Sequence, residues 1–364
     1  MRGLRLALPP AAPDTSGAAG VFYALGGIVI ICDAGGCAGN ICGFDEPRWQ
    51  SQKSAVFSAG LRDMDAILGR DDQLIAKLKS AASSVNANFA AIVGTPVPSV
   101  IGTDYHALCR MGYKETGIPV IAIPSDGTHL YDYGEEKAYL ALFETFSREK
   151  KQTKKEHRPH VIGVLGVTPL NTSMMNAEYK LRTFYADKYN DIWCYGAEGG
   201  LSPIENAAMA DMNLVIATSG LESAWYLKQQ FGTPFRIWNP FAEEAAESLL
   251  ASSILKETDD NTEQILILHQ QIYACSMRTA LRKKLPDAGI TVGSWFQMDE
   301  RLTEPQDISL REEDDLKTVA DDYDIIIGDS SMQKIIPDYR GKFIDCPHFA
   351  LSGRLSDGRE ATVQ

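Results

Sequence analysis

Short, almost entirely apolar runs recur along the chain at intervals that leave room for a helix between them. β-Branched residues dominate these runs and polar residues do not alternate with them, which is typical of parallel strands covered by helices on both faces. The expected strands are Ile28–Asp33, Ala90–Gly94, Val120–Pro124, Val161–Gly166, Asp191–Tyr195, Leu214–Thr218, Arg236–Trp238, Ile265–His269, Thr291–Trp295, Asp324–Gly328 and Phe343–Asp345.

The segments between these runs have the length and the apolar spacing of crossover helices. Each is ten to sixteen residues long, which suits a helix that returns the chain to the start of the next parallel strand. The expected helices are Ala55–Leu68, Asp71–Ser84, Asp104–Glu115, Gly134–Phe146, Ser173–Lys188, Leu221–Phe231, Ala242–Leu255, Gln270–Leu285 and Glu312–Asp321.

This alternation predicts an α/β protein of three Rossmann-like domains, each a mostly parallel sheet flanked by helices. The length of 364 residues exceeds what one hydrophobic core usually supports. Residues 149–160 form a dense basic polar segment, and residues 256–263 are polar and precede a new strand. We therefore expect an N-terminal domain with a candidate cluster loop over 1–157, a middle domain over 158–258 and a C-terminal domain over 259–364.

Composition narrows the classes of partner and compartment. A net charge of -13 and a pI near 5.0 disfavour a nucleic-acid partner, because neutralising phosphates needs a basic surface. No apolar run reaches the ~18 residues that span a bilayer, and the proline-broken start is too short for a secretory signal, so we expect a cytoplasmic protein without a membrane partner. Seven cysteines in such a chain favour buried thiols plus a metal site over a disulfide framework.

A glycine-rich stretch after the first expected strand holds three thiols within eleven residues. Cys37 follows Asp-Ala-Gly-Gly at the carboxyl end of the strand, where a side chain has no core role, so we expect it to bind a metal. Cys32 lies on the strand and is either a ligand or a small buried hydrophobe. Cys42 can fold back toward the same group or tuck beneath the loop. The spacing matches neither the common ferredoxin patterns nor a zinc knuckle.

The glycines of this stretch would let the backbone approach an inorganic group and aim amide N–H groups at its sulfurs. They are Gly35, Gly36, Gly39 and Gly43. Asp33 and Asp45 flank the stretch and either complete a mixed ligand set or cap turns.

Other strand ends carry weaker candidates. Thr103 or Asp104 can cap a helix whose N–H groups face an anion. Asp126 and His129 follow another strand, although Asp-Gly is ordinary turn chemistry. The remaining thiols Cys109, Cys194 and Cys275 are expected in the core.

After the last strand, Cys346 and His348 lie two residues apart. Both can face a ligand; equally, the thiol can be core and the imidazole can bond the backbone. No Gly-x-x-x-x-Gly-Lys-Ser/Thr phosphate loop is present, so ATP hydrolysis by this chain is not expected.

Several segments, taken in order and spacing, resemble the component 1 family of nitrogenase and nitrogenase-like oxidoreductases over most of the chain. These segments are the Gly-Gly-Cys37 stretch, Gly94–Asp104, Gly163–Pro169, Ile265–Leu281, Asp324–Asp329 and Pro347–Gly353. The resemblance implies three α/β domains, pairing with a homologous subunit, and an iron-sulfur cluster at the subunit junction held by three cysteine positions per chain.

Only the middle of these positions matches, and it is Cys37. The first, expected within Ser16–Gly20, reads Ser-Gly-Ala-Ala-Gly, and the third, in the Thr95–Val97 loop, holds valine. A smaller 4Fe-4S cluster is therefore expected rather than an eight-iron cluster. Cys42 and Cys32, or a partner chain, would supply the missing thiolates.

The resemblance also bears on the active-site cofactor and on the electron donor. Residues 216–220 hold no cysteine where the family's cofactor-binding subunit has one, so a molybdenum or vanadium cofactor is not expected. His348 is similar to the family's cofactor-binding histidine and is our candidate for facing a pocket, as proton donor or metal ligand. The implied partner is a separate ATP-dependent iron-protein reductase.

We therefore expect a subunit of a nitrogenase-like reductase, whose cluster relays low-potential electrons to an unidentified substrate. An alternative hypothesis is a scaffold or carrier for iron-sulfur or metallocofactor assembly. A third is a structural subunit without metal that stabilises a catalytic homologue.

Overall fold

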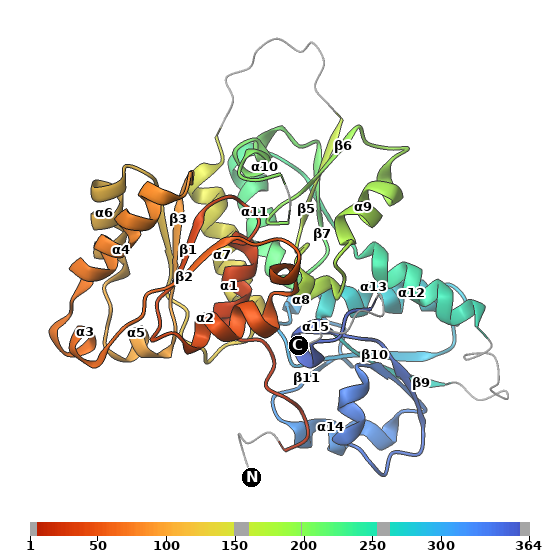
Figure 1. The fold of residues 1–364 in the computed structure, drawn as a ribbon. Coiled ribbons are helices and arrows are strands. Elements are labelled where there is room, and N and C mark those ends of the chain that lie inside the picture. Colours follow the sequence, from red (N-terminus) through yellow and green to blue (C-terminus); the bar gives the residue numbers. More distant parts are fainter. Residues whose placement is uncertain (1–5, 149–159, 198, 253–262, 357–364) are drawn as a thin grey trace.

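The structure, a computed structural model, describes residues 6–148, 160–197, 199–252 and 263–356. It contains three parallel sheets, each flanked by helices, and so confirms the predicted α/β fold class (Figure 1). Within these ranges, none of the helices combines the length and the apolar character needed to cross a membrane.

The first sheet carries the thiol segment at its carboxyl edge. Its order is β2-β1-β3-β4, formed by Ala55–Ser58, Ile28–Ile31, Ala90–Val93 and Val120–Ile123. One face packs on α4 (Asp71–Ser84) and α6 (Tyr105–Thr116), and the other on α1 (Asp14–Phe22) and α7 (Tyr131–Phe146). Because both faces are covered, the central strands β1 and β3 are buried throughout.

The second sheet shares α7 with the first. Its order is β6-β5-β7-β8, formed by Asp191–Cys194, Val161–Leu165, Met212–Val215 and Phe235–Ile237. One face packs on α7 and α11 (Leu221–Phe231), in the same hydrophobic cluster as the first sheet. The other packs on α9 (Ala177–Tyr185) and α12 (Pro240–Ala251).

The third sheet has the order β11-β10-β9-β12-β13, formed by Ile308–Ser309, Gly289–Ser294, Gln264–Leu268, Ile325–Gly328 and Lys342–Asp345. α12 and α13 (Gln271–Arg282) cover one face, and α14 (Glu313–Val319) lies on the other. α12 therefore packs between the second and third sheets.

The sequence predicted the strands better than the first helices. Each expected strand is present, with shifts at its ends. The helix expected over Ala55–Leu68 is wrong: the segment forms β2, a turn at Gly60 with φ +61°, and α3 (Asp63–Leu68). β11 and α1 were not predicted. The predicted domain boundaries, after residues 157 and 258, lie outside the described residues.

α1 and α7 cross very closely near the centre of the molecule (Figure 1). A Cβ atom at Gly17 would lie 1.8 Å from the carbonyl oxygen of Tyr131, and one at Gly134 would lie 1.8 Å from that of Asp14. Glycine is therefore required on both helices for the backbones to approach.

The chain before α1 packs against the part of the molecule that is built on the third sheet. Leu8 is buried in its hydrophobic cluster, and the Glu313 carboxylate accepts hydrogen bonds from the backbone N–H groups of Leu6, Ala7 and Leu8 at 2.7–3.1 Å. This N-terminal stretch thereby ties α1 to α14.

Candidate functional site

The thiol segment is helical rather than an open loop. After β1 the chain turns at Gly35, with φ +121°, into α2 (Gly36–Asn40), which carries Cys37. A π-helical turn, η1 (Ile41–Asp45), follows and carries Cys42. Of the glycines in this segment, only Gly35 adopts a conformation that favours glycine.

Cys32 lies in the hydrophobic cluster under α4 and α6, together with Leu74 and Leu108. Burial raises the pKa of its thiol to about 12, with a further contribution from Asp33. This environment favours the packing role over the ligand role.

Cys37 packs against the cluster on the opposite face of the sheet and is half-buried. Burial raises the pKa of its thiol, Asp33 raises it further, and hydrogen bonds from its own backbone and from the Thr95 hydroxyl partly offset the rise. The single hydroxyl hydrogen of Thr95 is donated to the Cys32 carbonyl at 2.8 Å in this structure, so the hydroxyl would rotate to donate to a Cys37 thiolate. A bound metal would deprotonate such a thiol.

Cys42 is also half-buried, and burial followed by the charge of Glu46 raises the pKa of its thiol. Glu46 forms a bidentate pair with Arg48 at 2.7 and 2.6 Å. Arg48 in turn donates to the Gly20 carbonyl at 2.6 Å, which fixes the segment after the thiols to the end of α1.

The three segments in which the family resemblance places cysteines converge here. The Ser16 hydroxyl of α1 donates to Asp45, on η1, at 2.6 Å. The adjacent Thr15 hydroxyl donates to the Gly94 carbonyl at 3.1 Å, in the loop that holds Thr95. α1, the thiol segment and the Thr95 loop therefore meet at the carboxyl edge of the first sheet, where Cys37 and Cys42 are partly exposed and Ser16 and Thr95 are buried.

Asp33 and Asp104 act as caps in the structure. Asp33 accepts from the backbone N–H of Ala38 at 2.8 Å and from the Ser58 hydroxyl at 2.6 Å, so it caps α2. Asp104 accepts from the N–H of Ala107 at 2.9 Å at the start of α6.

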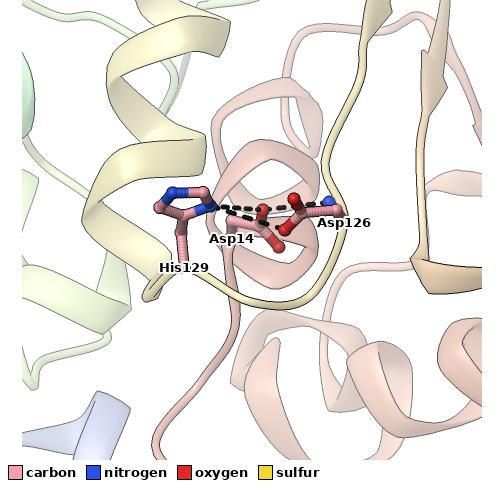
Figure 2. Close-up of side chains that lie close together, drawn as sticks. All are labelled: Asp14, Asp126 and His129. Carbon is pink, nitrogen blue, oxygen red and sulfur yellow. Dashed lines mark hydrogen bonds and ion pairs between the residues drawn. The ribbon is translucent and has the colours of Figure 1, made fainter. Parts of the chain in front are cut away.

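One group of three metal-ligating side chains lies within 4.8 Å among the described residues, and it contains no thiol: Asp14, Asp126 and His129 (Figure 2). The three thiols thus form no site for a single ion. A cluster spreads its thiolates over several irons, so cluster binding by Cys37 and Cys42 stays a prediction.

A second group of polar side chains is buried where the carboxyl ends of the second and third sheets meet α7. His348, before α15 (Phe349–Ser352), is completely buried. Its ring stacks on His269 with centroids 4.3 Å apart, and its Nε2 lies 3.1 Å from the Tyr131 hydroxyl. Burial lowers the pKa of His348 to about 3, so the imidazole is neutral at pH 7.

The hydrogen bonds around Tyr131 assign the proton of that neutral ring. Asn171, in α8 (Pro169–Thr172), directs its amide NH₂ to Glu135, so its oxygen accepts from the Tyr131 hydroxyl at 3.0 Å. The Tyr131 oxygen must then accept from Nε2–H of His348. Nδ1 of His348 has no partner at ordinary hydrogen-bond distance and angle, but the Leu170 backbone beside the ring favours a protonated imidazole and partly offsets the fall in its pKa.

Glu135, on α7, is the acidic centre of this group. Its carboxyl group is completely buried and accepts from Thr168, from Asn171 at 2.6 Å and from Ser219 at 2.7 Å. Burial raises its pKa to about 8. Thr168 and Ser219 follow β5 and β7, so the group joins α7 to the carboxyl edge of the second sheet.

Sequence reasoning identified His348 but missed its partners His269, Tyr131 and Glu135. The available signal was the pair Asp132 and Glu135 in the first turns of a helix whose later residues are mostly apolar. The remaining thiols show no shared site: Cys346 donates to the Tyr273 hydroxyl at 3.6 Å, Cys275 to the Leu302 carbonyl at 3.8 Å, Cys109 is half-buried and Cys194 is buried.

Comparison with known proteins gives three kinds of match: a relative in sequence, solved structures with a similar fold, and a family model. The chain is similar to the nitrogenase iron-molybdenum cofactor biosynthesis protein NifE of Clostridium pasteurianum, with 24% identity over 180 residues. This match covers 49% of the chain and 38% of that protein, so the chain matches well under two thirds of the relative's length.

Solved structures extend the likeness to the fold. Nitrogenase Cp1 at pH 6.5 superposes with a TM-score of 0.66 at 11% identity, over 95% of this chain and 87% of that one. Nitrogenase Cp1 at pH 5 gives 0.63 at 16% identity, over 94% and 84%. The sequence model of the family described as Nitrogenase component 1 type Oxidoreductase matches residues 14–278, well over half of the chain. The chain belongs to this family.

Proposed function

We propose that the chain is a subunit of a nitrogenase-like reductase that holds an iron-sulfur cluster at Cys37. In this proposal the cluster receives low-potential electrons from a separate ATP-dependent iron protein and relays them to a substrate that the sequence does not identify. The convergence of α1, α2 and the Thr95 loop around Cys37 carries the proposal.

The side chains at this surface favour a small cluster over an eight-iron cluster. Cys37 would be the first ligand and Cys42 the second, whereas Cys32 packs on the opposite face of the sheet. Ser16 and Thr95 stand in the other two family segments and offer hydroxyls, which are poorer iron ligands than thiolates. A 4Fe-4S cluster would then take its remaining thiolates from a partner chain.

Exposed apolar side chains beside the thiols support such a partner. Phe44, two residues after Cys42, is 52% exposed, and Val100, on α5 (Pro96–Val100) after Thr95, is 86% exposed. Apolar side chains that are exposed next to a polar site commonly mark a protein interface. We propose that a homologous component 1 subunit covers them.

His348 fits the role of a ligand or hydrogen-bond acceptor better than that of an acid. A buried imidazole with a pKa of about 3 is neutral, so a ring nitrogen would bind a metallocofactor or a substrate group once the packing around the ring opened. The proton-donor role is disfavoured near neutral pH for the same reason.

Iron and sulfide analysis of the anaerobically purified chain with its co-expressed partner tests the cluster. Cys37→Ala should abolish the visible absorption of the cluster. Cys194→Ala removes an equally small thiol from the core, so it should retain the cluster and lose only about 1 to 3 kcal/mol of stability. Equal cluster content in both variants, or substoichiometric iron in the wild type, would contradict the proposal.

A second candidate function is a carrier or scaffold for cofactor assembly, and the match to a cofactor biosynthesis protein favours it. The two functions differ in turnover rather than in metal content. A reductase subunit should have its cluster reduced by the cognate iron protein only when MgATP is present. A scaffold should instead release its metal to an apo-acceptor without such reduction.

A further inference from the structure

We propose that Asp14, Asp126 and His129 form a binding site for one divalent metal ion of the zinc class. The site is separate from the thiols, so it goes beyond the proposed function and does not depend on it. Figure 2 shows the three side chains pointing toward one another from the start of α1 and from the loop between β4 and α7.

The distances suit four-coordinate binding. His129 Nδ1 lies 3.4 Å from Asp126 Oδ1 and 4.0 Å from Asp14 Oδ2. Ligand atoms about 2.0–2.1 Å from a tetrahedral ion lie roughly 3.4 Å apart. Asp126 Oδ1 already accepts from the N–H and the hydroxyl of Thr128, so Asp126 Oδ2 would be the ligand atom. A small movement of this carboxylate would bring its Oδ2, Asp14 Oδ2 and His129 Nδ1 onto one ion, and at least one position would stay open for water.

The charges also call for a cation. Asp14 is buried, and among the described residues neither it nor Asp126 has a lysine or arginine partner; His129 is their shared ion-pair partner. Asp14 Oδ1 accepts from the backbone N–H groups of Thr15 at 2.7 Å and Gly127 at 2.9 Å, which uses both of its lone pairs. Asp14 Oδ2 accepts from the N–H of Asp126 at 3.1 Å and keeps one lone pair for an ion. A divalent ion would balance both carboxylates.

A buried polar group beside the cluster gives independent support. The Ser125 hydroxyl is buried and has no hydrogen-bond partner. Ser125 and Asp14 line one cavity of about 280 Å³ together. A water on the open position of the ion could fill part of this cavity and bond that hydroxyl, as buried polar groups in such cavities usually require.

The imidazole is accessible and held in place. The His129 side chain is 49% exposed, so an ion can enter from solvent. Its ring stacks on Tyr133 with centroids 4.2 Å apart, which restricts its rotation. One imidazole with two carboxylates is a donor set for zinc, manganese or iron(II) rather than calcium, and the near-tetrahedral distances favour zinc.

Zinc binding by the full-length chain tests the proposal. Stripped protein is titrated with ZnCl₂ by calorimetry, and the bound metal is counted after gel filtration. His129→Gln and Asp126→Asn should each lose one equivalent or weaken it at least tenfold. The side chain introduced by Asp126→Asn keeps an Oδ1 that can accept from Thr128, so the loop turn is retained.

His160→Gln is the matched control, because His160 Nδ1 also faces a carboxylate, Asp211, at 2.8 Å on the surface. The His160→Gln variant should bind as much zinc as the wild type, with the same affinity. Zinc held by thiols is common to all variants and cancels in the comparison. The proposal is overturned if His129→Gln binds as much zinc as the wild type, or if His160→Gln loses the same equivalent.

Discussion

The Glu135 carboxyl group makes the stability of the protein depend on pH. Its pKa is raised from 4.5 to about 8 in the folded chain. Below pH 4.5 both folded and unfolded states are protonated. Between pH 4.5 and 8 the unfolded chain loses its proton first, so folding free energy becomes less favourable as pH rises, and above pH 8 the loss is complete.

Glu135→Gln should therefore stabilise the protein at pH 9, by an amount on the order of 3 kcal/mol, and should have little effect at pH 4.5. The amide can accept from Asn171 and Ser219 through its oxygen and donate to Thr168 through its nitrogen. Urea unfolding at the two pH values measures the difference. Glu144→Gln, at an exposed position of the same helix, should change stability equally at both. A pH-independent effect of Glu135→Gln would show that folding does not raise the pKa of this carboxyl group.

Some residues of the candidate site can be identified from the sequence, and others cannot. Cys37 stands out because it follows a strand and glycines, and the structure places it on the surface where three family segments meet. The partners of His348 do not stand out, since Tyr131 and Glu135 lie on a helix more than two hundred residues earlier. Only the tertiary fold brings them together. Asp14 likewise meets Asp126 across 112 residues.

At the scale of elements, the crossing of α1 and α7 depends on two glycines. Gly17→Ala would place a methyl carbon 1.8 Å from the Tyr131 carbonyl oxygen, so the helices must separate. We expect a loss of roughly 1–3 kcal/mol or more, as for other overpacked cores. Gly20→Ala, on the same helix, would meet its nearest atom at 3.8 Å and should be neutral or stabilise by up to ~1 kcal/mol. Thermal unfolding of the two variants separates these outcomes, and equal melting temperatures would refute the close crossing.

This crossing also explains why α1 was not predicted. Its sequence, Asp-Thr-Ser-Gly-Ala-Ala-Gly-Val-Phe, is rich in glycine and small residues, which have low helix propensity or carry no periodic signal. Tertiary packing against α7 stabilises the helix. The expected helix over Ala55–Leu68 failed for the opposite reason: the half-exposed edge strand β2 and the short helix α3 together give apolar residues at helix-like spacing. Gly60 was the available signal for a break between them.

Over the whole molecule, the carboxyl ends of strands from all three sheets supply the chemistry. β1 and β3 lead to Cys37 and Thr95, and β5 leads to Thr168. β9 and β13 lead to His269 and His348. Sequence predicts this tendency, because open parallel sheets bind ligands at these edges. It does not predict that α7 connects these edges through the buried side chains of Glu135 and Tyr131.

The same arrangement leaves the thiol surface at the outside of the molecule, where the proposed partner subunit would cover it. Val100→Glu adds a charge at a side chain that is 86% exposed, so folding should be unaffected and circular dichroism unchanged. If this surface pairs two subunits, pairing would bury the new glutamate charge without a partner. The Val100→Glu protein, purified through a tag from the native host, should therefore be recovered as single chains. Tyr179→Glu is the control. Tyr179 is also highly exposed, at 73%, but it lies on α9, which covers the second sheet and not the first. Light scattering should give the wild-type mass for this control, and a wild-type mass for Val100→Glu would place the subunit contact elsewhere.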